Sequence, residues 1–124
     1  MERRIFVIGV ASAAATPLLA GGHGRLGAFV GVNGHTCSGT AEIAPRDGGF
    51  VVNLLDDFVF DGGPDPKVAL GRGGYDPATL MGPLQSNTGA SSYAVPTGID
   101  PGTYDEVWIW CEQFDVGLAV AAIG

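Results

Sequence analysis

Apolar and polar side chains alternate along several short stretches of the chain, and the clearest of them is residues 107–114. Its first four residues, Val-Trp-Ile-Trp, are branched or aromatic, and such side chains favour a pleated, half-buried strand. Because successive side chains of a strand point to opposite faces, Val107, Ile109 and Cys111 share one face and the two tryptophans share the other. The first face is apolar throughout, so we expect Cys111 to point into the core near the end of a central strand.

Residues 35–43 alternate in the same way and predict a second half-buried strand, with Cys37 on its apolar face. A turn with two glycines follows at residues 45–49 and leads into a return strand at 50–55. Further short strands are expected at residues 29–32, 67–70, 93–96 and 116–123. About eight short strands separated by turns that contain Gly and Pro predict an all-β fold, a small β-sandwich.

The composition supports one packed domain and excludes one class of partner. The chain has 124 residues, of which 46% are hydrophobic and 15% charged, which is enough for a single core and unlike a disordered chain. Its formal net charge is −7, and its 6 Lys and Arg are dispersed along the sequence. Nucleic-acid binding depends on clustered positive charge, so we exclude nucleic acid as a partner.

The N-terminus resembles an export signal. Arg3 and Arg4 precede a run of apolar and small residues at 5–20, which is too short to span a bilayer but suits the hydrophobic region of a signal peptide. The arginine pair fits a twin-arginine signal; an ordinary secretory signal and an uncleaved anchor are the alternatives. We expect an exported protein, periplasmic or extracellular, with no membrane span in the mature chain. Three parts are expected: a signal peptide (1–20), a Gly-rich segment (21–32) and the β-sandwich domain (33–124).

The two cysteines allow two kinds of chemistry. Both are predicted to face the core from separate strands, and a pair of cysteines in an exported protein favours a disulfide. A Cys37–Cys111 bond would close a loop of 74 positions (111 − 37) and contribute roughly 4–5 kcal/mol to stability in the chain-entropy model. A free Cys111 would instead be a shielded thiol suited to redox chemistry. The sequence leaves both alternatives open.

Acidic and aromatic clusters supply further candidates. Four aspartates lie close together as weak candidate calcium ligands, but they lack the spacing of an EF-hand loop, and an acidic turn is the simpler interpretation: Asp56, Asp57, Asp61 and Asp65. Trp108, Trp110 and Phe114 lie beside Cys111, where they could form an electron relay, the wall of a cofactor site or ordinary packing. The sequence has no Gly-x-Ser-x-Gly, His-x-x-x-His or Cys-x-x-Cys motif, so it encodes no recognisable cofactor site.

Taken together, several motifs resemble the DM13 (DM-thirteen) domain family: Gly34-His35, Ser38-Gly39-Thr40-Ala41, Gly63-Pro64-Asp65, Tyr93-Ala94-Val95-Pro96, and Val107-Trp108-Ile109-Trp110-Cys111 with Phe114. The resemblance covers about residues 33–122. Domains of this family are described as electron transfer modules, found beside DOMON domains in Skeletor-type proteins and alone in exported bacterial proteins. The resemblance implies a β-sandwich with a redox role for Cys111. Cys37 is not part of the family pattern.

Two hypotheses follow from these features. The first is an exported electron-transfer or thiol-redox domain centred on Cys111, with an unknown redox or protein partner and no identified cofactor. The second is a non-catalytic structural or binding module, stapled by a Cys37–Cys111 disulfide and presenting an acidic face to a partner or to Ca²⁺.

Overall fold

The computed structural model describes residues 24–124, and the predicted signal peptide at residues 1–20 lies outside this range. Within the described range no helix is long and apolar enough to cross a membrane. Residues 24–124 form nine strands and two short 3₁₀ helices: β2 (Arg25–Gly31), β3 (Cys37–Ser38), β4 (Thr40–Arg46), β5 (Gly49–Leu54), β6 (Val59–Phe60), β7 (Pro66–Gly71), η1 (Pro77–Thr79), β8 (Ser91–Ala94), η2 (Pro101–Thr103), β9 (Glu106–Cys111) and β10 (Val116–Ala122).

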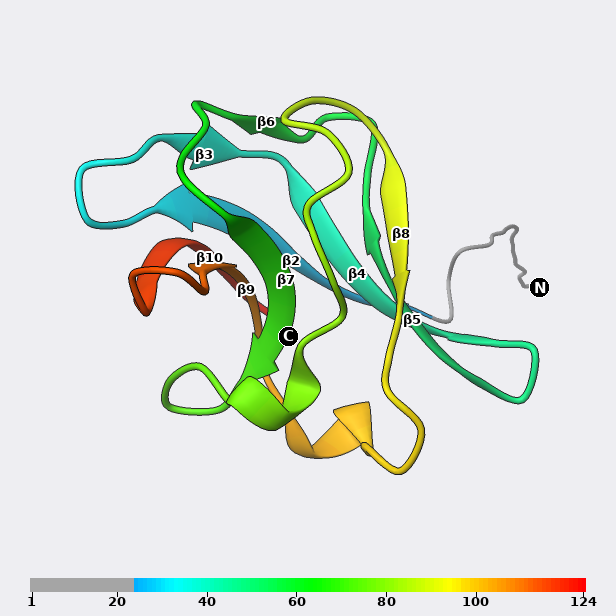
Figure 1. Ribbon diagram of the computed structural model, residues 1–124. Helices are drawn as coiled ribbons and strands as arrows, with labels where there is room; N and C mark the ends of the chain where they lie inside the picture. Colours follow the sequence, from blue (N-terminus) through cyan, green and yellow to red (C-terminus); the bar gives the residue numbers. More distant parts are fainter. Residues whose placement is uncertain (1–23) are drawn as a thin grey trace, which may run out of the picture.

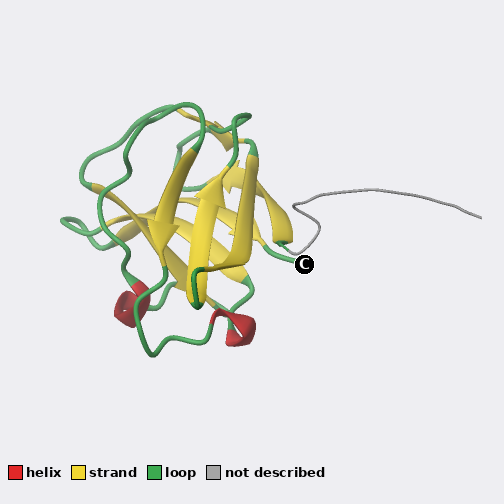
Figure 2. Cartoon of the chain, turned by 90° about the vertical axis from the view of Figure 1, so that its right-hand side faces the viewer, coloured by secondary structure: helices red, strands yellow, loops and turns green. Residues whose placement is uncertain are grey.

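Seven of these strands form one antiparallel sheet in the order β7-β9-β10-β2-β4-β5-β8, and β3 pairs with β6 in a separate two-stranded sheet. The large sheet curls until its edge strands β7 and β8 lie on the same side of the molecule (Figure 1). Figure 2 shows the strands surrounding a common interior, with the two 3₁₀ helices at one end. The predicted all-β fold of short strands is therefore confirmed, and its two facing layers belong to one nearly closed sheet.

Residues 81–88 occupy the gap between the two edge strands. The backbone N–H of Val68 in β7 donates to the carbonyl of Gly82 at 3.0 Å, and the N–H of Leu84 donates to the carbonyl of Pro66 at 2.9 Å. On the other side, the side-chain amide of Gln85 donates to the backbone carbonyl of Ser92 in β8 at 2.7 Å. These contacts give both edges hydrogen-bond partners, which protects a sheet edge from pairing with other chains.

The interior is filled by the apolar side chains of alternating strand positions. In β9, Val107, Ile109 and Cys111 are buried, whereas the side chains between them are only half-buried. The alternation predicted for this strand is thus confirmed. On the facing side, Phe29 and Phe58 pack edge to face with ring centroids 5.3 Å apart, an arrangement that aromatic pairs favour.

One predicted strand is broken in two. The alternating residues 35–43 do not form one strand, because Gly39 adopts a φ of +103° between β3 and β4. A Cβ at this position would lie 2.5 Å from the Cα of Phe58, so glycine is required both by its backbone conformation and by the close contact. The break carries Cys37 out of the large sheet and into the small β3–β6 sheet.

The folded domain also begins earlier than residue 33. β2, which falls in the expected Gly-rich segment, pairs with β10 on one side and with β4 on the other. Gly27 explains part of the glycine content here, because a Cβ on it would lie 2.1 Å from the carbonyl oxygen of Ala122. The glycine at this position lets β2 lie close to the C-terminal strand.

Candidate redox site

Cys111 ends β9, at the opposite end of this strand from η2. Its side chain is completely buried and belongs to the main hydrophobic core. Its Cα is paired with Val116 of β10 and with Pro66 of β7, so strands on both sides fix its position. The sequence-based prediction that Cys111 faces the core is therefore correct.

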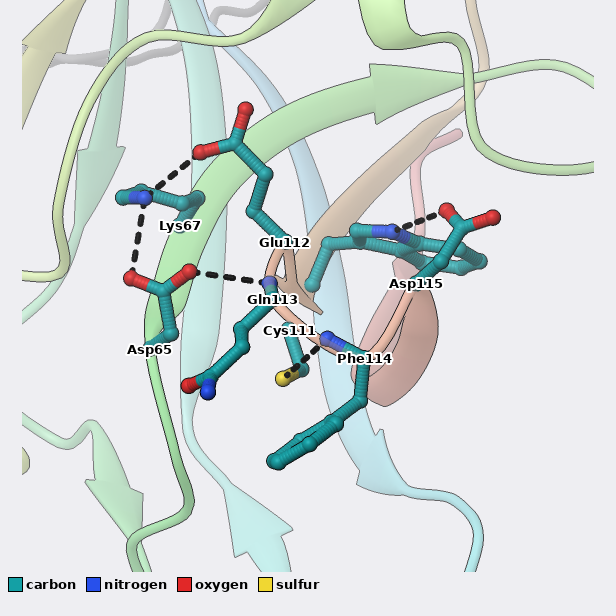
Figure 3. Close-up of polar contacts among 8 residues, drawn as sticks. Asp65, Lys67, Cys111, Glu112, Gln113, Phe114 and Asp115 are labelled. Carbon is teal, nitrogen blue, oxygen red and sulfur yellow. Dashed lines mark hydrogen bonds and ion pairs between the residues drawn. The ribbon is translucent and has the colours of Figure 1, made fainter.

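The turn at residues 112–115 covers the sulfur atom and contacts it directly. The backbone N–H of Phe114 donates to Cys111 Sγ, with 3.3 Å between nitrogen and sulfur (Figure 3). The turn closes because Asp115 adopts a left-handed backbone with a φ of +54°, a conformation that Asp tolerates better than most residues. The turn therefore both covers the thiol and supplies a backbone donor to its sulfur.

Asp65 holds this turn in place from the neighbouring chain segment. Its Oδ2 accepts the backbone N–H of Gln113 at 2.9 Å, and its own backbone carbonyl accepts the N–H of Glu112 at 3.3 Å. Asp65 itself has a φ of +47°. Figure 3 shows the Asp65 carboxylate between Lys67 and the turn. Asp65 thus joins two segments that lie far apart in the sequence.

Lys67 completes this network with two ion pairs. Its Nζ lies 2.6 Å from Glu112 Oε1 and 3.0 Å from Asp65 Oδ1. The hydrogen bond to Glu112, followed by that to Asp65, raises the pKa of Lys67 above its ordinary value, so the side chain stays charged. We name Asp65, Lys67 and Glu112 the turn clamp. Sequence reasoning assigned Asp65 only as a calcium candidate and did not select Lys67; the one signal for this role was the Gly63-Pro64-Asp65 motif.

The tryptophans of β9 lie on the outer face of the sheet, opposite the core. Both are half-buried, and their rings meet edge to face with centroids 5.5 Å apart. The ring of Tyr75, which the sequence did not single out, stacks on Trp110 at 4.0 Å. Phe114, by contrast, is 62% exposed at the tip of the turn.

The predicted Cys37–Cys111 disulfide is not present, since both cysteines, which lie within the described residues, are free thiols. The prediction assumed that both sulfurs point inward from strands that face each other. Instead, the bend at Gly39 places Cys37 in the β3–β6 sheet, while Cys111 lies in the large sheet. The stability assigned to a closed loop therefore does not apply.

Cys37 has a different environment from Cys111. It is only partly buried, and His35 and Asp61 lie nearby, with His35 Nδ1 3.1 Å from Asp61 Oδ1. Burial, and then the negative charge of Asp61, raise the pKa of Cys37 from 9.0 to about 12. A thiol with this pKa is almost entirely protonated at neutral pH and is a poor nucleophile.

The four aspartates considered as calcium ligands do not converge. Asp57 accepts hydrogen bonds from the backbone N–H and the hydroxyl of Thr40, Asp61 pairs with His35, and Asp65 belongs to the turn clamp. Asp56 is exposed. Between residues 24 and 124 no three His, Cys, Asp or Glu side chains are grouped so that they could hold a metal ion. The acidic-turn interpretation accounts for these residues better than the calcium interpretation.

Several surface hollows lie away from Cys111. One of about 350 Å³ is lined mainly by β5 and β8, with Arg46 and Asp47 at its rim. A second of about 230 Å³ lies beside Phe50 and Val95, and a third of about 140 Å³ lies beside η2. None of these three is lined by a cysteine, so a ligand bound in them would not contact either thiol.

Comparison with known proteins agrees with the motifs. The model of the family described as "Electron transfer DM13" matches residues 28–123, a range that begins inside β2 and ends after β10. No curated protein and no solved structure gives a match to the chain. The match confirms the family resemblance and includes both cysteines, the turn clamp and the aromatic residues of the outer face.

Proposed function

Because the chain belongs to the family of electron transfer DM13 domains, whose model covers residues 28–123, we propose that the sulfur of Cys111 is its redox-active atom. The observation that carries this proposal is the contact from the Phe114 N–H to Cys111 Sγ at 3.3 Å, in a turn fixed by Asp65. A thiol that only filled the core would not require a backbone donor aimed at its sulfur. The proposal extends to an exported protein, on the basis of its N-terminal sequence.

The redox step involves one electron and one proton. The thiol of Cys111 gives an electron to an oxidised partner, its S–H bond breaks, and the proton passes to water when the turn at residues 112–115 opens. The reverse step restores the thiol. The N–H of Phe114 donates to the sulfur and stabilises electron density on it, so this contact influences the potential of the couple. The partner is a one-electron carrier that docks near the exposed turn.

Voltammetry of the full chain tests the proposal. Wild-type protein and the Cys37→Ser variant should show the same reversible couple, because Cys37 lies in a separate sheet with a pKa of about 12. The Cys111→Ser variant should lack the couple while remaining folded by circular dichroism. An unchanged couple in Cys111→Ser, or no reversible couple in any of the three proteins, would overturn the assignment.

The structure does not contain the disulfide on which the alternative of a non-catalytic binding module was partly based. Its staple required a disulfide, and both cysteines are free. One feature of the structure that favours a binding module is the exposed Phe114, which lies on an acidic turn beside Glu112 and Asp115. Under this alternative Cys111→Ser would leave partner binding unchanged and the wild-type protein would show no reversible couple, whereas electron transfer through Cys111 requires a couple that Cys111→Ser lacks. Phe114→Ala would weaken partner binding under either function and does not separate the two.

A further inference from the structure

The outer face of β9 carries three aromatic rings in contact, which we call the aromatic ladder: Tyr75, Trp110 and Trp108. Tyr75 and Trp110 stack with centroids 4.0 Å apart and planes inclined by 12°, and Trp110 meets Trp108 at 5.5 Å and 85°. The rings pack over Gly117, where a Cβ would come within 2.7 Å of Trp108. All three side chains are half-buried. The ladder is therefore packed against the sheet on one side and remains partly exposed to solvent on the other.

Each indole of the ladder donates its N–H to a carboxylate. Trp110 Nε1 donates to Asp115 Oδ1 at 3.2 Å, and Trp108 Nε1 donates to Glu106 Oε1 at 3.0 Å. Loss of one electron turns an indole into a strong N–H acid. A carboxylate already hydrogen-bonded to that N–H is in position to take the proton without any rearrangement.

The electrostatic surroundings of the ladder favour positive charge on its rings. Burial raises the pKa of Tyr75, and the charges of Glu112, Asp115 and Asp76 raise it further, while the single charge of Lys67 acts in the opposite direction. The same carboxylates create a negative potential around Trp110. A negative potential lowers the cost of removing an electron from an adjacent ring and attracts cationic oxidants to this face.

We infer that the aromatic ladder is a one-electron relay in which Asp115 and Glu106 receive the protons of Trp110 and Trp108. The inference rests on the proposed electron-transfer function and adds a second group of redox-active side chains to it, in the same strand as Cys111. In the first step Trp110 gives one electron to a strongly oxidising one-electron acceptor outside the chain, which is reduced by one electron. The N–H bond of Trp110 breaks, an O–H bond forms on Asp115, and a neutral indolyl radical remains.

The second step moves the radical along the ladder. Trp108 gives one electron to the Trp110 radical, and its N–H proton passes to Glu106. Asp115 returns its proton to Trp110 Nε1, so Trp110 and Asp115 are restored and the radical resides on Trp108. Tyr75 contributes by stabilising the positive charge that Trp110 carries until its N–H proton has passed to Asp115.

Flash photolysis of the full chain with a ruthenium tris(bipyridine) photo-oxidant and a cobalt(III) quencher tests the relay. The optical absorption of the neutral tryptophanyl radical should appear in the wild-type protein. In Asp115→Asn, whose side chain tolerates the left-handed backbone, formation of this radical should slow by at least about tenfold, because the amide does not accept the proton. Asp47→Asn, an exchange of the same type at an exposed turn residue with a φ of +50°, is the matched control and should react like wild type.

Two further variants keep the test decisive. Glu106→Gln should leave radical formation on Trp110 intact and slow its transfer to Trp108, which separates the two steps even where Asp115→Asn folds poorly. Tyr75→Phe, which preserves the stacking, should behave like wild type, whereas Tyr75→Leu should reduce the radical yield. Wild-type kinetics in both Asp115→Asn and Glu106→Gln would show that these carboxylates only anchor the indoles, and would overturn the inference.

The relay and the role of Cys111 fail in distinguishable ways. No atom of the relay belongs to Cys111, so Cys111→Ser should still form the tryptophanyl radical at the wild-type rate. A lost relay with an intact Cys111 couple would refute this inference alone. An intact relay without any couple from Cys111 would refute the proposed function of the thiol alone.

Discussion

The two thiols of this protein lie in contrasting environments. Cys111 is fully buried, yet the Phe114 N–H donates to its sulfur. Cys37 is partly accessible, yet burial and the charge of Asp61 raise its pKa to about 12. The thiol that solvent can reach is therefore poorly suited to react, and the thiol that receives a backbone N–H is shielded from small reagents. The accessible thiol and the thiol that we propose as redox-active are therefore different residues.

The largest expected effect is on the alkylation of Cys37. At pH 8 a thiol of pKa 9.0 is about one-tenth thiolate, whereas one of pKa about 12 is about one ten-thousandth thiolate. Alkylation of Cys37 by iodoacetamide should therefore be on the order of a thousandfold slower in the folded protein than in denatured chain, and should increase until the pH passes about 12. Mass spectrometry of time-resolved samples gives the rate.

The same experiment counts the thiols. Denatured protein without reductant should take up two labels, because both cysteines are free. In the Cys37→Ser variant the remaining thiol should label only on unfolding or opening of the turn. If denatured protein took up no label, the two cysteines would be joined in a disulfide. If Cys37 were labelled rapidly in the folded protein, it would not have the raised pKa that distinguishes it from an ordinary thiol.

Replacing each cysteine by serine should lower the free energy of unfolding by different amounts at the two sites. Cys111→Ser places a hydroxyl in the core, where its proton lacks an evident acceptor, and should lower the free energy of unfolding by about 1–3 kcal/mol. Cys37→Ser, in a partly exposed site, should lower it by under about 1 kcal/mol. Urea unfolding followed by tryptophan fluorescence measures both. Equal losses in the two variants would show that the burial difference has no energetic consequence.

Removal of the clamp from the Cys111 turn should have a smaller effect. Asp65→Ala removes the acceptor for the Gln113 N–H and places alanine at a φ of +47°, so we expect a loss of about 1–2 kcal/mol and faster hydrogen exchange of the Gln113 amide. Asp65→Asn tolerates this backbone and keeps one oxygen acceptor, and its loss should be clearly smaller. If the Gln113 amide exchanged at the same rate in Asp65→Ala and wild type, the turn would be stable without the Asp65 side chain.

The strand pattern of this protein was predictable because it depends on local properties of the sequence. The period of two in β9 placed Val107, Ile109 and Cys111 on the buried face without knowledge of the partner strands. The bend at Gly39 could not be predicted in the same way, because it depends on the close approach of Phe58 from another segment. That single unpredicted bend separated Cys37 from the large sheet and made the disulfide prediction wrong.

The candidate site was predictable only in part, for a related reason. Cys111 and the tryptophans were selected from one contiguous stretch of sequence. Asp65 and Lys67 reach the turn because β7 pairs with β9, and Tyr75 reaches Trp110 from the loop after β7. Such contacts depend on strand order, which a single sequence does not specify. Asp65 therefore looked like one of several acidic residues rather than the residue that holds the turn.

The smallest expected effect concerns the charge beside Cys37. Asp61→Asn removes the second cause of the raised pKa of Cys37 but leaves burial, the larger cause, in place. Alkylation of Cys37 at pH 8 should therefore accelerate by only a few-fold, far less than on unfolding. Added salt should accelerate the wild type in the same direction, because it screens the charge of Asp61, and should have little effect on Asp61→Asn. Asp47→Asn, remote from Cys37 in the turn between β4 and β5, is the control. If Asp61→Asn reacted as fast as the denatured chain, charge rather than burial would control this thiol, and the contrast with Cys111 would rest on electrostatics alone.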